Sequence, residues 1–184
     1  MLKIEIKSTE IFNDKTQEFV VIPGAKLTLE HSLISIYKWE SKWKKSFLRT
    51  LETGLTVTEF ADYVRCMTVG QEAPSSTYAN VGALNAKKIK DYMEDSMTAT
   101  TFTNRDPNRS RKNEIITAEL IYYWMIEAGI PFECERWHFN RLMALIHVCG
   151  IKGSGGGKKM PKKEVLKEYS ALNAARRRAT GSRG

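Results

Sequence analysis

Residues 114–150 read EIITAELIYYWMIEAGIPFECERWHFNRLMALIHVCG, and this stretch decides the fold expected for the chain. In its first half, apolar residues recur at spacings of three and four, which is the period of an α-helix. Gly129 can adopt the left-handed conformation that ends a helix, and Pro131 cannot continue one. A second helical pattern starts near residues 132–135 and runs to Gly150, the next candidate for a helix end. The stretch therefore predicts two helices joined by a short break, an αα-hairpin.

The predicted hairpin is apolar on more than one side, most clearly in its first helix. The expected core stripe of the first helix is Ile116, Leu120, Tyr123, Trp124 and Glu127, and that of the second is Leu142, Leu145, Ile146 and Cys149. A helix that is apolar most of the way round is buried in a core or covered by a partner, and both interpretations stay open. Aromatic and Met side chains are enriched at protein interfaces. The second interpretation assigns partner binding to Tyr122, Tyr123, Met125, Ile126, Trp137 and Phe139, with the Tyr122/Met125/Ile126 side as the binding face.

The start of the chain predicts β-structure. Residues 2–7 alternate apolar and charged side chains, as a half-buried strand does, and residues 18–23 form a second run. The residues at 13–16, Asn-Asp-Lys-Thr, favour a turn, so the two runs are expected to pair as a β-hairpin. Residues 26–30 are a candidate third strand.

From Ser32 onward the period becomes helical. It predicts a helix over about 33–45. Thr56 and Glu59 have the spacing of a capping box, so a further helix is expected to begin there. The fold class that follows is α+β, with a small antiparallel β-hairpin or three-stranded sheet followed by a mainly α-helical domain.

The excess positive charge is confined to the end of the chain. Residues 152–184 hold ten Lys or Arg and two Glu, a net of +8 that equals the net charge of the whole chain. GSGGG at 153–157 has the composition of a flexible linker, and Pro161 can begin a helix after it. We therefore expect a β element at 1–31, a helical body at 32–151 and a linker with a basic helical arm at the end. The arm residues are Lys158, Lys159, Lys162, Lys163, Arg176, Arg177 and Arg178.

The sequence carries no recognisable motif of an enzyme active site. Phosphate-loop, dinucleotide-binding and nucleophile-elbow patterns are absent, and the three His lack the spacing of a zinc site. Cys66, Cys134 and Cys149 are widely spaced and odd in number, which indicates buried thiols in a reducing compartment. No catalytic residue, metal or cofactor is expected. Because no apolar run approaches the ~20 residues of a membrane span and no signal peptide is evident, the expected location is the cytoplasm.

Four segments together resemble a family found in tailed-phage genomes, whose members are described as tail assembly chaperones or tail-region proteins. They are LEHSLISIYKWESKW (29–43), MTATTF (97–102), IYYWMIEAGIPFECERWHFNRLMALIHVC (121–149) and ALNAARR (171–177). The resemblance implies a protein without catalysis that works in the host cytoplasm. Such a protein covers the long helical tape-measure protein in many copies until tail-tube subunits replace it. Tape-measure and tail-tube proteins are thus the implied partners.

Two other functions stay open. A structural virion protein, such as a head–tail connector or a tail accessory subunit, would be anchored by the basic arm and remain in the particle. The arm could alternatively bind nucleic acid without sequence preference, since clustered Lys and Arg neutralise phosphates. In each case the chain is expected to form a homo-oligomer or part of a larger assembly, away from the membrane.

Overall fold

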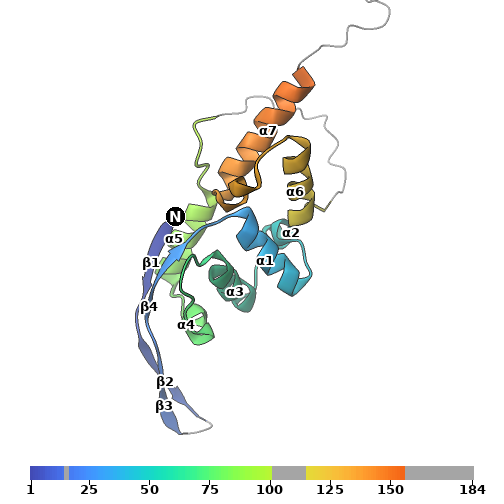
Figure 1. The fold of residues 1–184 in the computed structure, drawn as a ribbon. Helices are drawn as coiled ribbons and strands as arrows, with labels where there is room; N and C mark the ends of the chain where they lie inside the picture. The colour runs from blue at the N-terminus through green and yellow to red at the C-terminus, as the bar shows by residue number, and fades with distance from the viewer. Residues whose placement is uncertain (15–16, 101–114, 156–184) are drawn as a thin grey trace, which may run out of the picture. The chain divides into compact units, whose positions relative to one another are not determined.

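The computed structural model describes residues 1–14, 17–100 and 115–155. The expected α+β class is confirmed, since strands come first and helices follow (Figure 1). The seven assigned residues of the basic arm lie outside the described residues. The described elements are β1 (Leu2–Ile6), β2 (Thr9–Asn13), β3 (Glu18–Ile22), β4 (Ala25–Leu29), α1 (Leu33–Trp43), α2 (Phe47–Thr53), α3 (Val57–Met67), α4 (Ser75–Ala79), α5 (Ala83–Glu94), α6 (Ala118–Glu127), the 3-10 helix η1 (Phe132–Arg136) and α7 (Phe139–Gly155).

The contacts of the chain divide it into two units, Met1–His147 and Val148–Gly184. The first unit holds all the strands and every helix through η1, together with the first half of α7. The described part of the second unit is the remainder of α7. The candidate binding surfaces discussed below lie within the first unit.

The strands pair differently from the prediction. β1 pairs antiparallel with β4, and β2 pairs antiparallel with β3, so residues 2–7 do not pair with 18–23. Strand β2 was not predicted, and its last residue, Asn13, belongs to the turn-favouring run at 13–16. Both ladders keep one register, from Leu2 opposite Leu29 to Asn13 opposite Glu18. They are therefore two halves of one long β-ribbon.

The ribbon is interrupted where Pro23 and Gly24 lie between its halves. Pro23 has no backbone N–H to donate to a ladder. Gly24 lies against the opposite strand, where an added Cβ would be 2.6 Å from the carbonyl oxygen of Ile6 and 2.7 Å from the backbone nitrogen of Ser8. Only a residue without a side chain fits there, which accounts for the glycine.

The half of the ribbon formed by β1 and β4 packs on the helical body. Its side chains alternate, and the inward row is buried: Ile4, Ile6, Leu27 and Leu29. The side chain of Asn85 in α5 donates a hydrogen bond of 2.8 Å to the carbonyl oxygen of Glu5. Val69 donates its backbone N–H to the carbonyl oxygen of Thr28 at 2.8 Å, so the chain after α3 covers the edge of β4.

The helical core forms around α1, α2 and α3, each of which places a large aromatic side chain at its centre. Trp39, Phe47 and Tyr63 are fully buried, and the rings of Phe47 and Tyr63 stack with centroids 4.0 Å apart. The predicted helix at 33–45 is confirmed as α1, and α6 packs against it. Helices α1 and α6 are about eighty residues apart in the sequence. Local sequence patterns therefore do not predict that they are neighbours.

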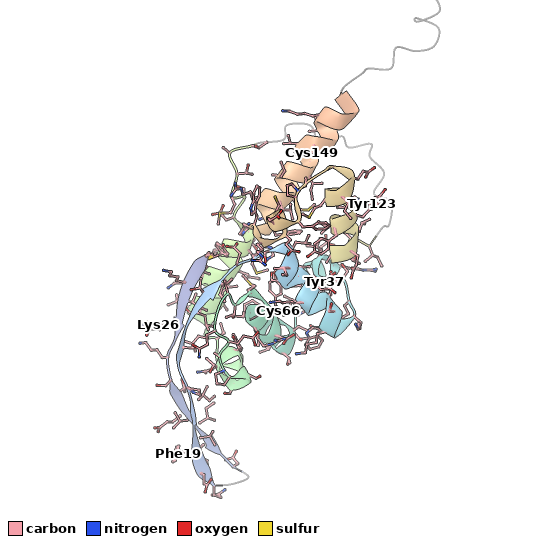
Figure 2. All side chains as sticks on the ribbon, viewed as in Figure 1. Phe19, Lys26, Tyr37, Cys66, Tyr123 and Cys149 are labelled. Carbon is pink, nitrogen blue, oxygen red and sulfur yellow. The ribbon has the colours of Figure 1, made fainter. Side chains whose placement is uncertain are left out.

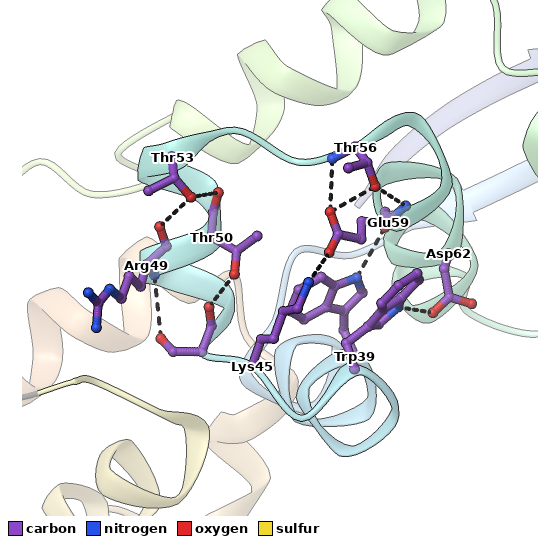
Figure 3. A network of polar contacts seen from close by, with 10 residues as sticks. Trp39, Lys45, Arg49, Thr50, Thr53, Thr56, Glu59 and Asp62 are labelled. Atoms are coloured by element: carbon purple, nitrogen blue, oxygen red, sulfur yellow. Dashed lines mark hydrogen bonds and ion pairs between the residues drawn. The ribbon is translucent and has the colours of Figure 1, made fainter.

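The predicted capping box at the start of α3 is confirmed (Figure 3). Glu59 donates its backbone N–H to the hydroxyl of Thr56 at 3.3 Å, and its carboxylate accepts the Thr56 N–H at 2.9 Å. The Nζ of Lys45 lies 2.9 Å from the same carboxylate, and Trp39 Nε1 donates to the Glu59 carbonyl oxygen at 3.1 Å. The Thr56 backbone N–H, followed by Lys45, lowers the pKa of Glu59 to about 2.

The two helices predicted within 114–150 form, but their limits differ from the prediction. Gly129 has φ +65° and follows α6, as expected of a residue that ends a helix. The segment after Pro131 is the separate helix η1, and α7 starts only at Phe139. Gly150 does not end α7, which continues to Gly155 and includes the first three residues of the predicted GSGGG linker.

Candidate functional site

Helix α6 buries a different face from the one predicted. Ala118, Ile121 and Met125 are fully buried, whereas Tyr123 of the predicted core stripe is 56% exposed and Glu127 is also exposed. Met125 therefore belongs to the core and cannot contact a partner, which corrects its assignment as a partner-binding residue. The same correction applies to Phe139, which is buried at the start of α7.

The outward face of α6 carries a cluster of aromatic and apolar side chains. Tyr123 and Ile126 project from α6 with 56% and 62% of their surface exposed, and Phe132 of η1 is 55% exposed. Tyr37 reaches the cluster from the neighbouring helix α1 (Figure 2). The half-buried ring of Tyr122 lies between Tyr37 and Phe132, with centroid distances of 6.2 Å and 6.3 Å. We call these five residues the aromatic surface.

Two hydrogen bonds hold the aromatic surface in place. The hydroxyl of Tyr122 donates to Oε2 of Glu135 at 2.7 Å, which ties α6 to η1. Burial, and then Glu135, raises the pKa of Tyr122, so it stays a neutral donor. The backbone N–H of Ala118 donates to Oε2 of Glu40 at 2.8 Å, which fixes the start of α6 on α1. The ring of Tyr122, which is already held in the free protein, would lose little conformational entropy on binding.

Three exposed acidic side chains lie on α6 and η1 near the aromatic surface. Glu119 and Glu127 lie four residues before and after Tyr123, on the same side of α6, and both are exposed. Glu133 follows Phe132 in η1 and is exposed as well. The arrangement suits a partner that presents apolar side chains flanked by Lys or Arg.

Trp137 does not join the aromatic surface through any ring contact among the described residues. It is half-buried, and the guanidinium carbon of Arg141 lies 4.1 Å from its ring centroid, a cation–π contact. Tyr37 and Phe132 belong to the surface but were missed by sequence reasoning. Phe132 follows the Pro131 break and could have been found as an exposed aromatic in a connection. Tyr37 carries no such signal, because its position depends on how α1 packs against α6.

A second cluster of polar side chains lies inside the first unit. His31 and His138 are buried with ring centroids 5.3 Å apart, and His31 Nδ1 is 2.5 Å from the hydroxyl of Tyr63. His138 Nε2 lies 3.0 Å from the carbonyl oxygen of Tyr92, and Ser35 Oγ is 3.4 Å from the Tyr63 hydroxyl. These contacts join α1, α3, α5 and the start of α7, so the cluster stabilises the fold.

Little among the described residues indicates reactive chemistry. Within residues 1–14, 17–100 and 115–155, no group of three or more His, Cys, Asp or Glu is placed to hold a metal ion. Cys66 and Cys134 are buried thiols, as predicted, but Cys149 is only half-buried. Burial, and then Asp62, raises the pKa of Cys66 to about 11, which leaves little reactive thiolate near neutral pH.

Helices of the described part of the chain are too short or too polar to cross a bilayer. Comparison of the chain with protein-family models, with curated proteins and with solved structures found no match.

Proposed function

We propose that this protein is a phage tail assembly chaperone that binds and shields the tape-measure protein through the aromatic surface. The observation that carries the proposal is the exposure of Tyr123, Ile126 and Phe132 around a ring, Tyr122, that is itself held by a hydrogen bond. Exposed aromatic residues of this kind dominate the free energy of protein–protein binding. The proposal also depends on the resemblance of four sequence segments to the tail assembly chaperones.

The partner is expected to present an amphipathic helix. The aromatic surface draws on α1, α6 and η1, so it can contact apolar side chains that recur every three or four residues along a partner helix. The carboxylates of Glu119, Glu127 and Glu133 would attract Lys or Arg at the margins of that helix. Binding is therefore expected to weaken as salt concentration rises.

Co-expression with the tape-measure protein of the same phage, followed by affinity capture, tests the proposal. The variant Tyr123→Asp/Ile126→Asp places two charges on the aromatic surface, and recovery of the tape-measure protein is expected to fall about tenfold or more. Val57→Asp is the matched control. Val57 is an apolar residue with 81% exposure at the start of α3, and this variant is expected to capture the partner normally. Equal recovery by both variants would refute the aromatic surface as the binding site.

One observation favours a structural virion protein as the second candidate. Strands β2 and β3 carry exposed apolar side chains, including Phe19 at 71% exposure, which a permanent subunit could bury against its neighbours. Mass spectrometry of purified particles separates the two candidates. A structural subunit is present in many copies per particle, whereas a chaperone is absent from the finished particle.

A further inference from the structure

The strands β2 and β3 form an arm that the helices do not cover. We call residues 9–14 and 17–22 the β-arm. In Figure 1 this half of the ribbon extends beyond β1 and β4, and Figure 2 shows Phe19 near its end. Its large apolar side chains are exposed: Ile11 at 48%, Phe12 at 43%, Phe19 at 71%, Val20 at 48% and Val21 at 59%.

Both faces of the β-arm carry apolar pairs. Phe12 lies opposite Phe19 on one face, with ring centroids 5.1 Å apart, and Ile11 lies opposite Val20 on the other face. Sheets that are apolar on both faces are normally covered on both. A two-stranded ribbon is also only marginally stable when it stands alone in water. The β-arm therefore has the composition of a segment that is enclosed by another surface.

The β-arm and its turn are acidic overall, since residues 9–22 hold three carboxylates against one lysine, Lys15. Glu10, Asp14 and Glu18 are exposed, and none of them forms an ion pair within the described part of the chain. Pairing of two β-arms edge to edge would bring these carboxylates together, which is unfavourable. A surface that carries both basic and apolar side chains would be complementary to the β-arm.

Such a surface lies along the other half of the same ribbon. An open groove of about 780 Å³ is lined mainly by β1, β4 and the first turns of α5, and it ends at Thr9, where the β-arm begins, and Asn80. The lysines at this groove are Lys3, Lys7, Lys26 and Lys88, against one carboxylate, Glu5. None of these lysines forms an ion pair with a described residue, and Leu84 offers an apolar side chain with 71% exposure beside them.

We infer that the β-arm of one copy of this protein docks in the lysine-lined groove of a second copy. The opposite charges of the β-arm and the groove select this pairing over contact between two β-arms. The apolar side chains of the β-arm cannot reach the groove of their own chain, because β2 and β3 continue the ribbon away from β1 and β4 (Figure 1). The contact is therefore between copies and head to tail, which generates a ring if it closes and a filament if it does not.

Sedimentation velocity of the purified full-length chain at several concentrations tests the inference. The wild-type chain is expected to associate, and association should weaken when ionic strength rises from about 0.05 M to about 0.5 M. The arm variant Phe12→Ser/Phe19→Ser and the groove variant Lys7→Glu/Lys88→Glu should each raise the dissociation constant about tenfold or more. Val57→Ser and Lys87→Glu are the matched controls, since both residues are exposed and lie outside the β-arm and the groove. These control variants should associate like the wild type.

Mixing the two variants gives the sharpest result. The arm variant keeps an intact groove and the groove variant keeps an intact arm, so an equimolar mixture should form one-to-one pairs that do not grow further. Circular dichroism of each variant checks that the helices remain folded. A monomeric wild type at all concentrations, a groove variant that associates normally, or a mixture that stays monomeric would each overturn the inference. Capture of the tape-measure protein is measured separately with the aromatic surface, so the two proposals can fail independently.

Discussion

His31 is a residue whose titration is linked to folding. Burial, and then the nearby His138, lowers the pKa of His31 from its ordinary value of 6.5 to about 3. The folded state therefore binds fewer protons than the unfolded state between these two values. As the pH falls below 6.5, proton binding to the unfolded state lowers the free energy of unfolding. The decrease is up to about 1.4 kcal/mol for each pH unit until the folded pKa is reached.

This linkage predicts a difference between the wild type and His31→Gln, which cannot titrate. Between pH 6.5 and about 4.5, the wild type should lose about 2 kcal/mol more of its free energy of unfolding than the variant does. Urea unfolding at a series of pH values measures both. Only the dependence on pH is compared, because removing the contact with Tyr63 also lowers stability at every pH. Parallel curves for the two proteins would show that His31 titrates normally.

At the scale of elements, Gly24 decides the course of the β-ribbon. Replacement by Ala would place a methyl group 2.6 Å from the carbonyl oxygen of Ile6, which is backbone and cannot move aside easily. We expect Gly24→Ala to lower the free energy of unfolding by about 1–3 kcal/mol, the usual cost of overpacking. Urea unfolding followed by circular dichroism measures the change.

Gly150→Ala is the control for the Gly24 variant. Gly150 lies inside α7, and an added Cβ there meets no atom of the described residues within 4 Å. Ala is favoured over Gly in a helix interior, so this variant should keep or gain stability, by up to about 1 kcal/mol. A large loss instead would indicate that Gly150 ends the helix, as the sequence alone had suggested.

Helix α6 shows why local sequence can predict an element and still miss its orientation. The run from Leu120 to Ile126 is apolar at every position, so several faces fit the helical period equally well. Packing against α1 selected Ile121 and Met125 for the core and left Tyr123 in solvent. The existence of the helix could be predicted, but the division of its side chains between core and aromatic surface could not.

At the scale of the whole molecule, one carboxylate joins three helices. Glu40 of α1 accepts the backbone N–H of Phe47 at 2.7 Å and that of Ala118 at 2.8 Å. These are the first residues of α2 and α6, where backbone N–H groups lack partners within the helix. Burial raises the pKa of Glu40, against the lowering effect of these two hydrogen bonds.

Glu40→Gln tests this junction. The amide keeps one acceptor but sets its NH₂ group against the other backbone N–H, so a buried donor loses its partner. We expect a loss of about 1–3 kcal/mol in the free energy of unfolding. Glu52→Gln, on the exposed side of α2, is the matched control and should change stability by less than about 0.5 kcal/mol. An equally small effect of both variants would show that Glu40 does not hold the helices together.

The sequence by itself determined the α+β class, the start of α1, the capping box of α3 and the break at Gly129, because each depends on residues close together in the chain. It also predicted the turn region near residue 14, but it paired the strands wrongly. Only the tertiary structure decided that β1 pairs with β4, and that Tyr37 joins Tyr122 and Phe132. The strand pairing and the aromatic cluster depend on contacts between residues that are far apart in the sequence. Such contacts form only when the chain folds, so no local sequence pattern specifies them.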